Sequence, residues 1–407
     1  MNKFHIRSIS IIVLLLSAFM ALGIIFAPRK DIKEGEEEDM AVVGADRIDI
    51  ILQIVRDKRV GLIVNQTSVL HNGTHLLDTL LKKNVKVVKV FAPEHGFRGM
   101  EEAGEAVKNA IDSKTGVPVT SIYGSNNKPT AAQLADIDML IFDIQDVGAR
   151  FYTYISTMHF SMEACAENGK EFIVLDRPNP NDFIDGPIRK EGFSSFVSVD
   201  PIPVLHGLTV GELACMINGE GWITTGKHSC KLKVVLMDNW AHGVPHHVSI
   251  NPSPNLPNNT AIRLYPSLCF FEGTNISVGR GTTFPFQVLG NPNEKYGTFT
   301  FTPQPIRGMD SNPMHNGKTC YGIDLRDNTF EGGLSLKYVM DFFEKSGYNE
   351  KDFFTRARFF DLLAGTDQLR LQIINRLSED EIRSSWQQEL NDYRIMRKKY
   401  IFYDEPL

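Results

Sequence analysis

Several short motifs that mark nucleotide-dependent and serine-dependent enzymes are missing from the sequence. No G-x-G-x-x-G follows a strand-like run, and neither a P-loop nor a G-x-S-x-G stretch is present. Dinucleotide and ATP binding depend on the first two patterns, and a serine nucleophile is usually carried by the third. The sequence therefore predicts no cofactor and gives no support to a serine hydrolase.

Paired cysteines and dense basic runs are also missing. The five cysteines are far apart, with no C-x-x-C and no histidine at zinc spacing, so no metal site is expected. Their apolar neighbours favour buried structural cysteines. The net charge of -6 and the pI near 6.0 argue against a nucleic-acid partner, because phosphate binding needs a basic surface. No protein partner is indicated either.

The N-terminal region, in contrast, has the features of a targeting segment. Lys3, His5 and Arg7 precede an apolar run over residues 9–27, which is the pattern of a secretory signal. The run is close to membrane-spanning length, so an uncleaved anchor is the alternative. We expect export to the periplasm or to the outer face of the cytoplasmic membrane. Residues 1–40 would then comprise this leader and an acidic spacer over 31–39.

Short apolar runs alternate with helical patterns from Val60 onward, and the runs are rich in Val and Ile. This alternation predicts parallel βαβ units with helices on both faces of a sheet. We expect an α/β fold with a Rossmann-like catalytic domain over residues 41–257. A change in sequence composition near Asn258 indicates a smaller C-terminal α+β domain over 258–407. We expect the active site in the cleft between the two domains.

Polar clusters follow several of the expected strands. They are Asn65 to Thr67, Glu94 and His95, Asp143 to Asp146, and Asp176 to Asn179. In parallel sheets, ligands collect outside the carboxyl ends of the strands, so these clusters are expected to share one rim.

Glu94 is the strongest catalytic candidate on this rim. It lies in "FAPEHGFRG", between an apolar strand and the glycines Gly96 and Gly99. A partly shielded carboxyl group suits a general acid, and the glycines permit close backbone approach. The alternative is a helix-capping carboxylate or one paired with Arg98.

Two further segments carry candidate sugar contacts. The stretch "FDIQDVGARFYTYIS" combines acid, amide, arginine and aromatic groups of the kind that line carbohydrate sites; these are Asp143, Gln145, Asp146, Arg150, Tyr152 and Tyr154. The alternative is a structural role, in which Asp143 caps a helix, Arg150 pairs with Asp146, and the tyrosines belong to the core. The loop-like "FEGTNISVGRGT" adds Glu272, Thr274 and Arg280, either at the interdomain cleft or in a plain hairpin.

The sequence also contains several long motifs that follow one another in a fixed order. They include "GLIVNQTSV", "FAPEHGFRG", "IFDIQDVGARFYTYISTM", "VLDRPNP", "SPNLPN" and "YPSLCFFEGTNISVGRGTTFPFQVLG". From about Val60 to Tyr403 the chain resembles the NamZ-like exo-β-N-acetylmuramidases. The resemblance implies hydrolysis of terminal N-acetylmuramic acid from the non-reducing end of peptidoglycan fragments. It also implies that Glu94 of the "PEHG" motif is the catalytic acid.

The resemblance leaves the other roles open. The second catalytic group would be Asp143 or Asp146 before Glu272, or the acetamido group of the substrate itself. Arg98, Arg150 and Arg280 are the cations available for the lactyl carboxylate of muramic acid, and Asn65 and His95 join them as expected substrate contacts. A non-catalytic cell-wall binding protein is the competing interpretation. An amide or ester hydrolase ranks last, because no activated nucleophile is visible.

Overall fold

The computed structural model describes residues 24–25, 41–97, 109–124, 126–223 and 229–405. The expected leader and acidic spacer lie almost entirely outside the described residues, and so does Arg98. Within the described part, no helix combines the length and apolar character that a membrane span requires.

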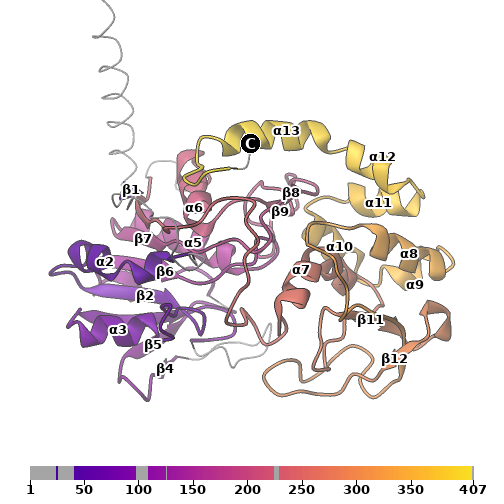
Figure 1. Cartoon of the computed structure of the whole chain (residues 1–407), viewed down its shortest axis with the longest axis horizontal. Helices are drawn as coiled ribbons and strands as arrows, with labels where there is room; N and C mark the ends of the chain where they lie inside the picture. Colours follow the sequence, from indigo (N-terminus) through magenta and orange to yellow (C-terminus); the bar gives the residue numbers. More distant parts are fainter. Residues whose placement is uncertain (1–23, 26–40, 98–108, 125, 224–228, 406–407) are drawn as a thin grey trace, which may run out of the picture.

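An eight-stranded sheet organises the first part of the chain, in the order β1-β10-β7-β6-β2-β3-β5-β4 (Figure 1). All neighbouring strands run parallel except β4 and β5. The strands are β1 (Ile24–Ile25), β2 (Val60–Val64), β3 (Val87–Ala92), β4 (Ala110–Ile111), β5 (Pro118–Ser121), β6 (Met139–Asp143), β7 (Glu171–Leu175) and β10 (Lys231–Val235). The predicted α/β class with a mostly parallel sheet is confirmed.

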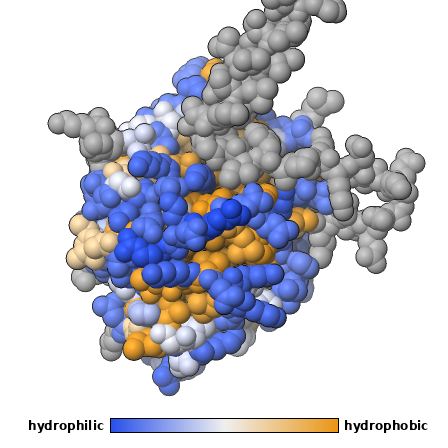
Figure 2. All heavy atoms as spheres, turned by 90° about the vertical axis from the view of Figure 1, so that its left-hand side faces the viewer, coloured by the Kyte–Doolittle hydropathy of each residue, from blue (hydrophilic) through white to orange (hydrophobic). Residues whose placement is uncertain are grey.

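Helices cover both faces of this sheet, because alternate strand residues point to opposite sides. Leu62 and Val64 join one hydrophobic cluster with α2 (Ile48–Ile54) and α3 (Leu76–Lys82). Ile63 joins another with α5 (Tyr154–Glu167) and α6 (Val210–Gly219). A short α4 (Ala131–Leu134) precedes β6. Figure 2 shows the sheet side of the molecule, where a hydrophobic band lies between hydrophilic side chains.

The strand order reverses between β2 and β6. The chain builds outward from β2 through β3 to β5, then returns to β6 and continues on the other side through β7 and β10. Loops leaving the carboxyl ends of β2 and β6 therefore diverge, which creates the crevice where open α/β sheets bind ligands.

The C-terminal part is a smaller α+β unit, as predicted. Its antiparallel sheet has the order β11-β13-β12. The strands are β11 (Val288–Asn291), β12 (Phe299–Phe301) and β13 (Cys320–Asp324). The helices are α7 (Asn259–Leu268), α8 (Lys337–Lys345), α9 (Glu350–Phe353), α10 (Ala357–Ala364), α11 (Gln368–Ile374), α12 (Glu379–Ser384) and α13 (Gln387–Arg397), with the 3-10 turns η2 (Cys269–Gly273) and η3 (Glu294–Tyr296).

One hydrophobic cluster runs through both parts. It includes Phe142 and Ile155 of the sheet region together with Phe270 and Phe360 of the C-terminal part. All five cysteines are free thiols buried in the structure, which confirms the prediction of structural cysteines.

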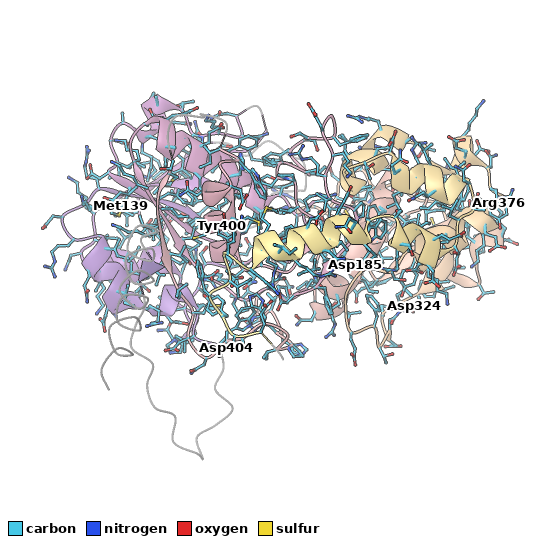
Figure 3. The ribbon with its side chains drawn as sticks, turned by 90° about the horizontal axis from the view of Figure 1, so that it is seen from above. Met139, Asp185, Asp324, Arg376, Tyr400 and Asp404 are labelled. Carbon is cyan, nitrogen blue, oxygen red and sulfur yellow. The ribbon has the colours of Figure 1, made fainter. Side chains whose placement is uncertain are left out.

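The chain ends by returning to its first half. Helix α13 runs from the C-terminal helices toward α6 (Figure 1). We call residues 398–405, which follow it, the C-terminal tail. Seen from above, α13 crosses the molecule lengthwise, with Tyr400 and Asp404 over the sheet region (Figure 3). The hydroxyl of Tyr403 donates to Asp176 Oδ2 at 2.6 Å, so the tail fastens the two parts together.

Candidate active site

Glu94 lies in a tight turn directly after the carboxyl end of β3. The next two residues, His95 and Gly96, have positive φ angles of 64° and 73°. Glycine adopts this left-handed conformation at little cost, but histidine does so rarely and only where the surrounding structure compensates. The backbone is therefore strained immediately beside a half-buried carboxylate.

Two hydroxyl groups donate hydrogen bonds to the carboxylate of Glu94, one to each oxygen. The hydroxyl of Tyr123, just after β5, is 2.7 Å from Oε1. The hydroxyl of Thr153, at the start of α5, is 2.5 Å from Oε2. Burial and the adjacent Glu94 carboxylate raise the pKa of Tyr123 well above its ordinary value, so its phenol remains protonated and able to donate.

Tyr152 and Tyr154 form a wall beside Glu94. Their rings meet edge to face at 5.0 Å, and the hydroxyl of Tyr154 lies 3.5 Å from the backbone carbonyl oxygen of Glu94. Burial is the main cause that raises the pKa of both tyrosines, and the charges of Glu94 and Asp146 raise it further. The two carboxylates therefore act on the same pair of rings.

Aromatic contacts continue this wall into the C-terminal part. Tyr152 meets Tyr265 of α7 at 5.8 Å between ring centroids, and Tyr265 meets Phe286 at 4.9 Å. The guanidinium of Arg280 lies 5.1 Å from the centre of the Phe286 ring. Arg280 Nε is 2.6 Å from Glu272 Oε1. Burial alone would lower the pKa of Arg280, but this ion pair raises it.

The two carboxylates after β6 have different surroundings. Asp143 is fully buried and forms a two-pronged ion pair with Arg177, at 2.6 and 3.0 Å. Asp146 is 5% exposed, and its Oδ2 accepts a 2.6 Å hydrogen bond from the backbone N–H of Gly148. Its Oδ1 is buried without a hydrogen-bond partner in the described structure. Of the two, Asp146 is the one with a carboxylate oxygen that no hydrogen bond occupies among the described residues.

A cavity of about 860 Å³ opens next to this site, over the ends of β2, β6 and β7. Thr67, Gln145 and Arg177 lie at these strand ends, and Trp240 and His246 belong to the loop opposite. Glu94 is not among its lining residues. The chain thus has a hollow at the reversal of strand order and, beside it, the separate carboxylate-and-tyrosine cluster around Glu94.

Comparison with known proteins identifies the family. The model for the N-terminal part of the exo-β-N-acetylmuramidase NamZ matches residues 60–260, and the model for its C-terminal part matches residues 263–403. The chain belongs to the NamZ exo-β-N-acetylmuramidase family. It is therefore a member of a glycoside hydrolase family, as predicted.

Individual NamZ relatives support this membership over most of their length. The peptidoglycan β-N-acetylmuramidase NamZ of Bacillus subtilis (strain 168) is 40% identical over 374 residues, which covers 86% of this chain and 88% of that protein. A crystal structure of a DUF1343 family protein of Bacteroides fragilis NCTC 9343 superposes with a TM-score of 0.82 at 42% identity, covering 90% of this chain and all of that one. A second protein of that family and organism gives 0.77 at 32% identity, covering 89% and 99%.

Two of the expected substrate contacts, Arg150 and Thr274, are engaged by backbone carbonyl groups inside this NamZ-family chain. Arg150 is 1% exposed, and its guanidinium donates to the carbonyl oxygens of Pro187, Ile202 and Leu363 at 2.6 to 2.8 Å. Thr274 is fully buried, with its hydroxyl 2.8 Å from the Phe271 carbonyl oxygen. We correct both expectations, because groups engaged in this way cannot reach a sugar without disrupting the core.

The other expected contacts are distributed around Glu94. Asn65, at the end of β2, is fully buried, and its Oδ1 accepts two hydrogen bonds from Thr67. His95 is 5% exposed in the strained turn. Glu272 and Arg280 are each about one-fifth exposed, so they remain accessible. Arg98 lies outside the described residues.

Sequence reasoning missed the two hydroxyl groups that hold Glu94. Thr153 lies within "RFYTYIS", in which the neighbouring tyrosines were the expected contacts. Tyr123 is 29 positions from Glu94 in the chain. Because no strand was expected where β5 lies, Tyr123 was not placed on the rim that parallel neighbours share.

Proposed function

We propose that this protein is an exo-acting glycoside hydrolase that releases terminal N-acetylmuramic acid from the non-reducing end of peptidoglycan fragments, with Glu94 as the general acid. The observation that carries the proposal is the position of Glu94: a strained turn holds its carboxylate against two hydroxyls, beside an aromatic wall. Tyr152 and Tyr154 are 8% and 2% exposed and belong to the hydrophobic core, so their rings support the Glu94 turn from behind. Membership in the NamZ family supports the substrate class.

In the proposed reaction, Glu94 transfers its proton to the glycosidic oxygen as the bond from that oxygen to the anomeric carbon breaks. The leaving sugar departs as an alcohol, and water completes the hydrolysis at the anomeric carbon. Asp146 is the favoured protein group for the second role, because its buried Oδ1 is unpaired within the described structure. Asp143 is less suited, since its charge is already neutralised by Arg177.

The lactyl carboxylate of muramic acid requires a cation, and we assign this role to Arg280. Arg150 donates to backbone carbonyl oxygens in the interior, whereas Arg280 is partly exposed at the end of the aromatic wall. Glu272 holds Arg280 through Nε, which fixes the orientation of the planar guanidinium. An arginine held in this way can present its remaining N–H groups to a carboxylate.

The test is turnover of a para-nitrophenyl β-N-acetylmuramide by wild type, Glu94→Gln and the control Glu344→Gln. Loss of an acid catalyst predicts a fall in kcat of about 10²- to 10⁴-fold for Glu94→Gln. Glu344 is an exposed residue of α8, so its variant should match wild type. The corresponding N-acetylglucosaminide, which lacks the lactyl group, should be a poor substrate.

Two results would contradict the proposal. Full activity of Glu94→Gln would remove Glu94 from the acid role. No turnover by folded wild type, together with retained binding of muramic-acid glycans, would favour a non-catalytic cell-wall binding protein.

We also propose export, supported by the apolar run over residues 9–27. Cell fractionation with an antibody to the folded part tests this.

A further inference from the structure

Thr153 occupies the N-cap position of α5 but does not cap the helix. A threonine in this position ordinarily accepts a hydrogen bond from a backbone N–H in the first turn. The side chain of Thr153 makes no such bond, and its hydroxyl is directed to Glu94 Oε2 at 2.5 Å. The capping interactions of Thr130, Thr209 and Ser378 at other helices are complete. Those three residues have extended backbones, whereas Thr153 has φ −75° and ψ −2°, so its hydroxyl is not placed to cap α5 and is engaged by the carboxylate instead.

Tyr123 reaches the other oxygen of Glu94 from a different element. Tyr123 lies just after β5, and its hydroxyl is 2.7 Å from Oε1. The centroid of its ring is 5.8 Å from that of Phe196. A phenol is a stronger donor and a weaker acceptor than an aliphatic hydroxyl. Tyr123 therefore keeps donating to Oε1, whereas Thr153 can either donate to Oε2 or accept from it.

The different donor strengths of the Tyr123 and Thr153 hydroxyls decide which oxygen of Glu94 carries its proton. When the carboxyl group is protonated, its hydrogen belongs on Oε2, whose neighbour Thr153 can become an acceptor, and for transfer it turns from Thr153 to the glycosidic oxygen. When the proton leaves, both hydroxyls donate to the carboxylate that forms. Hydrogen bonds to a charged oxygen are stronger than those to a neutral one, so both interactions strengthen as the transition state is approached.

We propose that Tyr123 and Thr153 are positioning residues for Glu94, which assign its transferable proton to Oε2 and stabilise the carboxylate left after transfer. This inference rests on the proposed function of Glu94. Among the described residues, the Glu94 charge acts on Tyr123, just after β5, on Tyr152, and on Tyr154 of α5, and Asp146 acts on the latter two. Neither positioning residue needs to contact the sugar.

The experiment compares Tyr123→Phe, Thr153→Val and Thr153→Ser with wild type, measuring kcat, KM and the pH dependence of kcat/KM on the muramide. Tyr123→Phe and Thr153→Val should each lower kcat about 10- to 100-fold, the range for a lost hydrogen bond to a charged group. KM should change little. The high-pH limb should move to higher pH, because the ionised carboxylate has lost a donor.

The remaining variants separate positioning from packing. Thr153→Ser keeps the hydroxyl and should restore both kcat and the limb. Tyr338→Phe, which removes a hydroxyl bonded to Asn328 in the C-terminal part, should leave both unchanged. If Tyr123→Phe does not fold, the Thr153 pair alone decides the question, since the Thr153 side chain makes no capping bond that valine would remove.

Wild-type kcat and an unmoved limb in folded Tyr123→Phe and Thr153→Val would overturn the inference while leaving Glu94 as the acid. Equal losses in Thr153→Ser and Thr153→Val would also overturn it for Thr153, because a hydroxyl is then not what matters. Full activity of Glu94→Gln would instead contradict the proposed function, and the inference would fail with it. The two failures are therefore distinguishable.

Discussion

Arg150 is a buried cation whose guanidinium is bonded by backbone carbonyl groups. Two of these belong to the first part of the chain, and the third, Leu363, belongs to α10 of the C-terminal part. Burial, with the charge of Arg189 nearby, lowers the pKa of Arg150 to about 9, which still leaves it charged at neutral pH. Gly365 makes room for it, since an added Cβ there would lie 2.8 Å from Arg150 Nη2.

Replacing Arg150 by methionine should destabilise the protein by at least about 3 kcal/mol, because three buried carbonyl groups lose their donors. Urea unfolding followed by tryptophan fluorescence measures this change. Arg307→Met, at an exposed position, is the matched control and should stay within about 0.5 kcal/mol of wild type. A stable Arg150→Met variant with a raised KM would instead return Arg150 to the substrate site.

At the scale of elements, the C-terminal tail packs onto a group of ionisable side chains. The backbone N–H of Phe402 donates to Glu212 Oε1 at 2.9 Å, and the carbonyl oxygen of Asp404 accepts from the backbone N–H of His242 at 2.9 Å. His242 lies between two carboxylates, with Nδ1 2.9 Å from Asp182 and Nε2 3.0 Å from Glu212. The attachment of the tail is thus coupled to protonation of this histidine.

Stability is therefore expected to fall as the pH rises above neutrality. Burial alone would lower the pKa of His242, but its bonds to Asp182 and Glu212 raise it to about 9 from an ordinary value of 6.5. A raised pKa means that the folded state holds the proton more tightly, so this contribution is complete below about pH 6.5 and is lost as the pH approaches 9. Thermal unfolding from pH 6 to 9.5 measures it. The decline should be shallower in His242→Gln, and an identical slope would exclude His242 as the cause.

For the whole molecule, the continuous core matters more than the division into two parts. Phe151 meets Tyr265 at 5.4 Å and Phe270 at 5.7 Å between ring centroids, so residues just before α5 pack directly on α7 and η2. The tail adds a second connection beyond the chain link near residue 258. Removing the C-terminal part would expose this aromatic surface to water.

We therefore expect the folded part to unfold in one cooperative transition, and a fragment of residues 41–257 to be unstable alone. Calorimetry of residues 41–407 should give a single peak whose calorimetric and van't Hoff enthalpies agree. Expression of the 41–257 fragment should give aggregated or poorly folded material. Two separate transitions, or a soluble fragment with a cooperative melt, would show that the parts are independent domains.

The sequence by itself determined the central strands and led to the proposal of Glu94 as the acid. The Val- and Ile-rich runs became β2, β3, β6 and β7, because strands covered on both faces must be apolar throughout. "PEHG" placed Glu94 in a turn at a strand end, which is a local property of proline, glycine and the strand before them. Family motifs extended this to the NamZ family, which the comparisons confirmed.

Only the tertiary structure decided which polar side chains face one another. Glu94 meets Tyr123 from 29 positions away, Asp143 meets Arg177 from 34, and Arg150 meets Leu363 from 213. Periodicity in a sequence reports which face of an element is buried, but it does not report which distant group will share that burial. A buried arginine and a substrate-binding arginine look alike in the sequence, because the difference between them is made by carbonyl groups that long-range packing brings within hydrogen-bond distance.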